Sequence, residues 1–398
     1  IDGEAAEDHS GHMISLSADG TILAIGAPDN DANGSQSGHV RVYQYVSGLY
    51  SGSWVKVGYD IDGEYAGDNM GYSVSLSSDG SVLAIGARNH DSNGLTNNGR
   101  VYTYELIKQP ITSIVKMGSS IDGEAPGDYS AHSVSSNANG TIVAIGSPYK
   151  TVNGIIYAGH VRVYQYTNNS WDQIGSDIDG ENARDQVGYS VSLSADGSIL
   201  AIGSYEDDND NGNISGCVRV YEWNGSIWNQ MGSDIIGERP NDYSGKRISL
   251  SADGKIVAIH GMSDDNGNDS GHVRVYDYDN TRTTPWRQMG SDIDGESVND
   301  NLGGGLSLSA DGTVLAIGGP YNEVNGFANA GHVQIYQYVA DSAWIKVGYD
   351  IVGDNTNAEC GYSVSLSGDG TILTIGSRRS DNNGIASGSV TTYEVLKQ

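Results

Sequence analysis

The side chains best suited to chemistry are carboxylates and amides that stand at alternate positions just before a glycine. Asp29, Asp31 and Asn33 precede Gly34 in this way. Oxygen ligands at this spacing, followed by a sharp turn, are how short loops surround the hard cation Ca²⁺. The spacing returns at Asn89, Asp91 and Asn93, and at Asp207, Asn209 and Asn211. We therefore expect these residues to be metal ligands, with Ca²⁺ as the candidate cofactor.

A simpler origin for these loops remains open. An Asn-Gly pair occurs in all seven of them, and a left-handed turn explains that pair without any metal. The corresponding loop at Tyr149, Thr151 and Asn153 lacks acids. No loop supplies an acid at its ninth or twelfth position, where Ser37 and Val40 stand in the first loop.

Groups that could act as catalytic acids or bases mostly recur at fixed positions. Histidine returns at His39, His160, His272 and His332, and arginine at Arg41, Arg100, Arg162, Arg219 and Arg274. Recurrence indicates architecture, with the arginines paired to loop carboxylates or backbone carbonyls. The pattern is broken at Trp223, Lys246, Arg247, His260, Arg378 and Arg379. Because these form no nucleophile or acid/base constellation, we expect no enzyme; a glycan-active hydrolase or lyase is the alternative.

A repeat that fills the chain must position all of these residues. The segment IDGE stands at Ile1, Ile61, Ile121, Ile178 and Ile293, with IIGE at Ile235 and IVGD at Ile351. Successive segments are 57 to 60 residues apart. The chain is thus expected to be a single domain of seven repeats, 1–60, 61–120, 121–177, 178–234, 235–292, 293–350 and 351–398.

Each repeat predicts four β-strands. In the second, Tyr72 to Ser77 alternates polar and apolar residues, Ser81 to Gly86 is mostly apolar, and Ser-Asp-Gly between them is a tight hairpin turn. The third strand is His39 to Tyr45 in the first repeat, and the fourth is centred on a residue such as Trp54. Four strands repeated seven times predict an all-β, seven-bladed β-propeller of antiparallel blades. A linear β-solenoid is the structural alternative.

The last blade is expected to lack its outer strand, because Gln398 directly follows the third strand of the seventh repeat. Its tail, TYEVLKQ, is similar to TYELIKQ at Thr103 to Gln109, where the second repeat continues into a fourth strand. This similarity favours truncation. A neighbouring domain or another chain could complete the blade at its open edge.

Composition excludes several classes of partner. The chain has 50 acidic and 21 basic residues, a formal net charge of −29, which repels nucleic acid and anionic lipid surfaces. It has no apolar run long enough to enter a membrane as a helix. Cys217 and Cys360 fall at different repeat positions and predict neither a disulfide framework nor a zinc cluster.

The acids are expected to gather on one face. In an antiparallel blade, the loop between the second and third strands and the loop to the next blade lie at the same end. In the first repeat that end collects Asp2, Glu4, Glu7, Asp8, Asp29 and Asp31. The acids of the IDGExxxD segment are expected to accept backbone N–H groups within their long loop.

The segment GYSVSLSSDGSVLAIGARNHDSNGLTNNGRVYTY, with DNMG just before it, resembles the FG-GAP repeats of integrin α-subunit propellers and their microbial surface relatives. The resemblance extends over essentially the whole chain and implies a propeller on a cell surface, often calcium-binding and adhesive. In that family the calcium loop lies between the first two strands. Here the hairpin Ser17 to Gly20 leaves no room for it, so the family's ligands do not carry over. Tyr72, Tyr189 and Tyr362 replace the usual phenylalanine.

We therefore expect an extracellular or cell-surface binding or adhesion scaffold that presents an acidic loop face to a protein or glycan ligand. An intracellular scaffold similar to the WD-repeat propellers is a further alternative, although the sequence lacks WD signatures.

Overall fold

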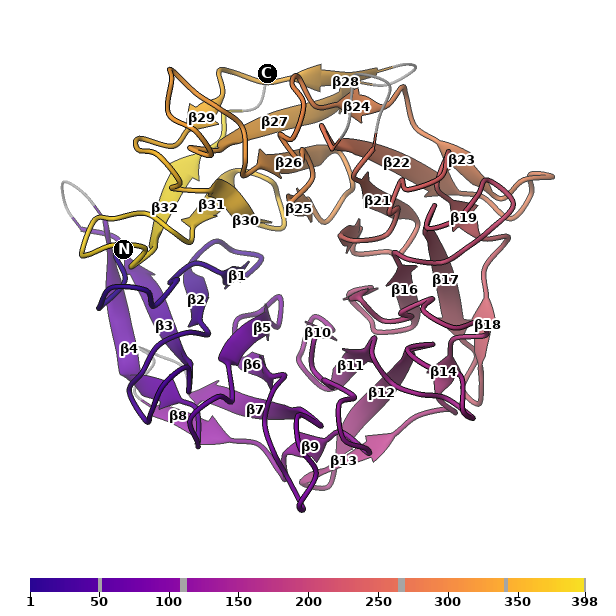
Figure 1. Cartoon of the computed structure of the whole chain (residues 1–398), viewed down its shortest axis with the longest axis horizontal. Coiled ribbons are helices and arrows are strands. Elements are labelled where there is room, and N and C mark those ends of the chain that lie inside the picture. The colour runs from indigo at the N-terminus through magenta and orange to yellow at the C-terminus, as the bar shows by residue number, and fades with distance from the viewer. Residues whose placement is uncertain (49–51, 108–112, 264–268, 340–342, 397–398) are drawn as a thin grey trace.

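The computed structural model describes residues 1–48, 52–107, 113–263, 269–339 and 343–396. They form seven antiparallel sheets in a ring, and the chain runs once around it (Figure 1). This confirms the predicted seven-bladed β-propeller. Among the described residues, no helix is long and apolar enough to cross a membrane.

Strands one and two of each blade form the predicted hairpin at the centre of the ring. The first strands are β1 (Met13–Leu16), β5 (Met70–Leu76), β10 (Ser133–Ser136), β15 (Ser190–Leu193), β20 (Ile248–Leu250), β25 (Gly305–Leu308) and β30 (Cys360–Leu366). The second strands are β2 (Ile22–Ala27), β6 (Val82–Ala87), β11 (Ile142–Ser147), β16 (Ile199–Ser204), β21 (Ile256–Gly261), β26 (Val314–Gly319) and β31 (Ile372–Ser377). In blade 1 the turn is tight, with the N–H of Gly20 donating to the carbonyl oxygen of Ser17 (2.9 Å).

The outer half of each blade is a second hairpin. The third strands are β3 (His39–Val46), β7 (Arg100–Ile107), β12 (His160–Thr167), β17 (Cys217–Trp223), β22 (His272–Tyr278), β27 (His332–Val339) and β32 (Ser389–Glu394). The fourth strands are β4 (Ser53–Asp62), β8 (Ser113–Lys116), β13 (Ser170–Gln173), β18 (Trp228–Gln230), β23 (Trp286–Gln288) and β28 (Ala343–Lys346).

After the fourth strand, the chain makes a short strand pairing that the sequence does not predict. In blade 1 the end of β4 returns to β3, where Ile61 and Asp62 pair with Val40 and His39. In five other blades this pairing is a separate strand, namely β9 (Ile121–Asp122), β14 (Ile178–Asp179), β19 (Ile235–Ile236), β24 (Ile293–Asp294) and β29 (Ile351–Val352). Each blade therefore ends with the first residues of the next sequence repeat.

The core lies between blades. Val40 and Val42 of blade 1 share one buried cluster with Val74 and Leu76 of blade 2. The second strands are covered on both sides, and all six residues of β2 are buried. A Cβ atom on Gly26 would lie 2.2 Å from the carbonyl oxygen of Gly71 in the next blade, so the sheets approach too closely there for any side chain. Small residues on these strands are required by the ring.

Blade 7 has three strands, β30, β31 and β32, as predicted. The N-terminal residue occupies the place that β9 or β14 takes in other blades. The N–H of Val390 donates to the carbonyl oxygen of Ile1 (2.8 Å), and the terminal ammonium of Ile1 donates to the carbonyl oxygen of Val390 (2.9 Å). The ring is thus closed by residues 389 positions apart.

Candidate functional site

Two kinds of loop meet on one side of the ring, as the sequence predicts. In the loop from blade 1 to blade 2, the N–H of Gly67 donates to the carbonyl oxygen of Ser35 (2.9 Å), in the loop between β2 and β3. The N–H of Asn69 donates likewise to Gln36 (3.0 Å). We call this side the loop face. The hairpins between first and second strands lie at the other end.

The first predicted calcium loop directs its polar side chains to protein partners. A carboxylate oxygen of Asp29 lies 2.7 Å from Nδ1 of His9. Asp31 accepts a backbone N–H of its own loop at 2.8 Å. The amide of Asn33 donates to the carbonyl oxygen of Gly63 in the next repeat (2.8 Å). These contacts close the loop and join it to the following blade.

The second predicted loop is engaged in a similar way. The amide of Asn89 donates to Oδ1 of Asn69 (2.5 Å), and Asp91 accepts a backbone N–H of its own loop (2.7 Å). Asn93 lies on the surface, with its amide 3.4 Å from Asp122. The three side chains diverge toward separate partners.

The third predicted loop contains a partly buried ion pair. Asp207 lies 3.1 Å from the guanidinium of Arg219. The amide of Asn209 donates to a backbone carbonyl of its own loop (2.9 Å), and that of Asn211 donates to the carbonyl oxygen of Gly237 in the next repeat (2.8 Å). The part of the chain that the structure describes brings no residue of the three loops into a group of three or more acidic, histidine or cysteine ligands. Calcium binding here stays a prediction of the sequence.

The last acid of the IDGExxxD segment has the structural role that the sequence predicts. A carboxylate oxygen of Asp8 accepts the N–H of Ala5 (2.9 Å), and Asp128 accepts that of Ala125 (2.8 Å). These bonds satisfy backbone donors in a long loop. The acids are therefore part of the loop's own framework.

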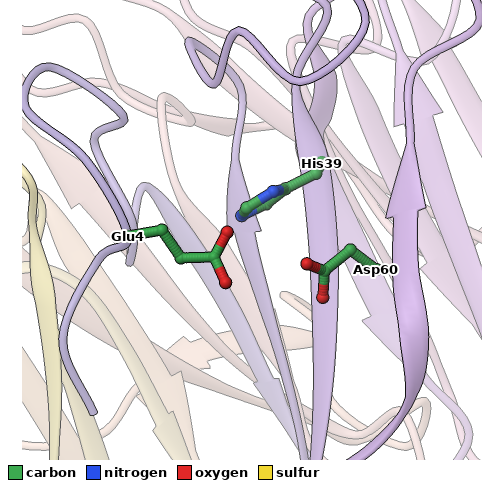
Figure 2. Close-up of side chains that lie close together, drawn as sticks. All are labelled: Glu4, His39 and Asp60. Carbon is green, nitrogen blue, oxygen red and sulfur yellow. The ribbon is translucent and has the colours of Figure 1, made fainter.

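One group with metal-ligand chemistry lies where Glu4, His39 and Asp60 meet, from three segments of blade 1 (Figure 2). One ligand atom of each lies within 4.8 Å of the others. Two cations already balance the carboxylates, because Arg41 lies 3.3 Å from Glu4 and Lys56 contacts Asp60. A divalent metal ion would have to displace both, so the cluster is better described as an ion-pair network.

The equivalent group in blade 3 is Glu124, His160 and Asp177. Here Glu124 is paired with Arg162 at 3.1 Å and with Lys150 at 3.2 Å. Nδ1 of His160 lies 3.4 Å from Asp177, and this contact lowers the pKa of Asp177 to about 2. The predicted pairing of recurring arginines with loop carboxylates is confirmed.

A different kind of site forms at the axis. The position just before the SVSLS segment holds His12, Tyr72, His132, Tyr189, Lys246, Gly304 and Tyr362 in the seven repeats. Of these, His132, Tyr189, Gly304 and Tyr362 line a cavity at the axis. Five of the seven residues have rings that form an arc across blades 7 to 4. The ring centroid of His12 lies 5.2 Å from Tyr362 and 4.9 Å from Tyr72, and that of His132 lies 5.2 Å from Tyr72 and 4.5 Å from Tyr189. Burial lowers the pKa of both histidines well below the usual value, so their rings are neutral.

Cations surround this aromatic arc. The guanidinium of Arg88 lies 3.7 Å from the ring centroid of Tyr72, and that of Arg378 lies 3.6 Å from that of Tyr362. Nε of Arg247 donates to the carbonyl oxygen of Gly304 (3.2 Å). These groups make one end of the channel aromatic and cationic.

The two ends of the channel differ in symmetry. The cavity of about 140 Å³ at the aromatic end touches all seven blades and is lined by His132, Tyr189, Arg247, Gly304 and Tyr362 among others. The cavity of about 160 Å³ at the hairpin end is lined by equivalent residues of each repeat, chiefly leucines such as Leu16. The repeat is thus broken at the end surrounded by the loop face. We call this end the channel mouth.

Sequence reasoning marked Lys246, Arg247 and Arg378 as departures from the repeat. The structure places Arg247 in the lining of the channel mouth and Arg378 over the ring of Tyr362, which also lines it, whereas Nζ of Lys246 lies 3.3 Å from the sulfur of Met262. Sequence reasoning missed Arg88, which looks in the sequence like one more residue after an AIGA strand. An alignment of the seven repeats that compares the residues before SVSLS with those after AIG would have identified Arg88 together with the other cations.

The other residues that depart from the repeat contact neighbouring side chains or backbone of the protein. The ring centroids of Trp223 and Trp228 lie 5.3 Å apart within blade 4. His260 is fully buried on β21, and a Cβ on Gly303 of blade 6 would lie 2.4 Å from its ring. Arg379 lies 3.5 Å from Glu359 at the surface.

Comparison with known proteins supports the fold and the repeat. Residues 61–104 match the FG-GAP repeat family. No curated protein matches the chain. Among solved structures, the chain is similar to one titled a putative 6-phosphogluconolactonase from Bacteroides uniformis, with a TM-score of 0.57 and 13% identity over 94% of this chain and 96% of that one. At this identity the likeness shows the fold alone. The second repeat is an FG-GAP repeat, and the seven-bladed ring around it fits the FG-GAP β-propeller family.

Proposed function

We propose that this protein is an extracellular or cell-surface binding scaffold that recognises a protein or glycan through its loop face, and that it binds without catalysing a reaction. An FG-GAP repeat in a propeller fits a binding scaffold, and FG-GAP repeats are commonly extracellular. The repeating ion-pair networks are explained by blade architecture. The residues of the channel mouth, which blade architecture does not explain, are then the candidates for ligand binding.

The observation that carries the proposal is the broken symmetry of the channel. Positions that only hold blades together keep the same chemistry in nearly every repeat. At the hairpin end one such position is leucine in six repeats and Ser136 in the third. A binding site needs unlike groups in one place. At the channel mouth the equivalent positions are tyrosine, histidine and glycine. The loops around the mouth add exposed apolar tips, among them Ile156, Tyr157, Phe327 and Ile385.

A glycan array and a panel of extracellular matrix and cell-surface proteins, probed with the labelled chain, test the proposal. We expect Tyr189→Ala, at the channel mouth, to weaken binding to the retained ligand about tenfold or more, the scale of one lost aromatic contact. Tyr349→Ala is the matched control, because Tyr349 is 97% exposed outside the mouth. Equal losses in the two variants, or release of cleaved glycan by the wild type, would contradict the proposal.

A further inference from the structure

Cations are scarce in this chain, and most of them are paired. Arg41, Arg162, Arg219 and Arg274 each lie within 4.0 Å of a carboxylate. With 50 acids for 21 basic residues, each cation is expected to find a carboxylate partner. A lysine or arginine with no acid partner is therefore unusual here.

Two such cations belong to the channel mouth. Among the described residues, no carboxylate forms an ion pair with Arg88 or Arg247. Arg247 lines the cavity, and Arg88 lies over the ring of Tyr72. The third cation of the mouth, Arg378, is neutralised by Glu359 at 2.5 Å. The mouth thus holds positive charge that the protein itself does not balance.

These charges converge on one space. Arg247 and Tyr362 line the cavity together with His132, from blades 5, 7 and 3. Burial lowers the pKa of His132, and the positive charges of Arg88 and Arg247 lower it further. Cations of blades 2 and 5 therefore act on one imidazole that lines the cavity.

Buried donors in this space also lack partners. His132 is 7% exposed, and its Nδ1 has no hydrogen-bond partner among the described residues. Nε of Arg88 is likewise buried without one. An unpaired buried donor costs free energy, and a bound acceptor would recover it. A cation pair with unused donors around a small cavity has the chemistry of an oxyanion site.

We propose that the channel mouth binds the oxyanion of an acidic sugar, a carboxylate or a phosphate. Arg88 and Arg247 hold the oxyanion, and the cavity-lining rings of Tyr189 and Tyr362 pack against the sugar ring. This inference rests on the proposed function and adds the class of ligand.

Calorimetric titration of the full chain with glucuronate, glucose 6-phosphate and glucose tests the inference. We expect either acid to bind and neutral glucose to bind about tenfold more weakly or not at all. The two acids distinguish a carboxylate from a phosphate ligand. Glucose binding as strongly as both acids, or no binding of either acid, would overturn the inference.

Variants locate the site. Arg247→Gln and Arg88→Gln should each weaken binding of the acid about tenfold. Lys255→Gln is the matched control, because Lys255 is exposed in the hairpin between β20 and β21 at the other end of the channel. Circular dichroism and the unfolding midpoint show that each variant is folded, and using two variants keeps the test decisive if one is not. A loss with Lys255→Gln equal to theirs would mean general charge screening, and would contradict the site.

The two proposals can fail separately. If the array retains a neutral glycan or a protein at the loop face while glucuronate and glucose 6-phosphate do not bind, the scaffold function stands and the oxyanion site falls. If an acid is bound at the mouth and then converted, the site stands and the non-enzymatic function falls.

Discussion

Asparagine amides at the position before the loop glycine bond to the loop that leads to the next blade, and two of them, Asn33 and Asn211, are predicted calcium ligands. Asn33 reaches the carbonyl oxygen of Gly63, Asn211 that of Gly237, and Asn383 that of Gly3, at 2.8, 2.8 and 3.0 Å. A side-chain amide suits this role because it carries a donor on a short, neutral arm. The Asn-Gly pair thus combines a turn with an interblade hydrogen bond.

Thermal unfolding in excess EDTA and then in millimolar Ca²⁺, at fixed ionic strength, tests the calcium prediction. A cation that binds only the native state raises its unfolding midpoint by mass action. If Asp207, Asn209 and Asn211 are ligands, Ca²⁺ should raise the midpoint, Mg²⁺ should not reproduce the rise, and Asp207→Asn should reduce it. Fixed ionic strength is needed because the −29 charge responds to any added salt. An unchanged midpoint would leave the loops to their hydrogen bonds alone.

Among the elements, the fourth strands hold the outer ring together through their tryptophans. The indole N–H of Trp228 donates to the carbonyl oxygen of Ile174 (3.3 Å), Trp286 to that of Met231 (2.7 Å) and Trp344 to that of Met289 (2.9 Å). In each case the acceptor follows the fourth strand of the preceding blade. Each blade is therefore fastened to the one before it.

Trp54 is the exception, because the blade before it is blade 7, which has no fourth strand among the described residues. It lines a cavity of about 420 Å³ with Ile1 and Tyr393 beside β32. The structure gives its indole N–H no hydrogen-bond partner within the described ranges. This cavity is where a fourth strand of blade 7 would pack.

We expect Trp286→Phe to lower the free energy of unfolding by about 1 kcal/mol more than Trp54→Phe does, because only the first change removes a hydrogen bond. Both substitutions keep an aromatic ring in place. Denaturant unfolding of the two variants and the wild type measures the difference. Equal losses would show that packing, and not the indole N–H, fastens the blades.

The strands could be predicted because their residues recur in every repeat. The channel mouth could not, because its residues differ from one repeat to the next. Alternation in Tyr72 to Ser77 and the Ser-Asp-Gly turn specify the inner hairpin locally, so seven copies specify seven blades. The channel mouth depends on single residues from different repeats. Arg88 and Arg247 act on the same histidine, His132, only because blades 2, 3 and 5 are arranged in one ring, and nothing within either repeat indicates the other.

At the scale of the whole molecule, the contacts between blades 7 and 1 close the ring. The N–H of Gly3 donates to the carbonyl oxygen of Gly388 (2.8 Å), and Asn383 donates to Gly3 in return (3.0 Å). Glu4 adds an ion pair with Arg41 at 3.3 Å. Each contact also occurs between other blades, but here it joins the two ends of the chain.

Removing residues 1–4 should therefore lower the free energy of unfolding by about 3 kcal/mol, the sum of a few hydrogen bonds at about 1 kcal/mol each. Calorimetry measures the loss, and hydrogen exchange should show reduced protection in β32. Glu4→Gln is the control, because it removes only the ion pair with Arg41 and should cost about 1 kcal/mol or less. Unchanged protection in β32 would mean that its inner neighbour, β31, is enough to hold it.

The closing contact also delays closure of the ring until the end of synthesis. Ile1 leaves the ribosome early, but its partner Val390 is 389 residues further along the chain. At about 5 to 20 residues per second, the first residues wait roughly 20 to 80 seconds for a partner. Each blade needs only local pairing, so an open arc of completed blades grows during that interval. The channel mouth, which draws on blades 2, 3, 5 and 7, comes into existence only when the last blade arrives.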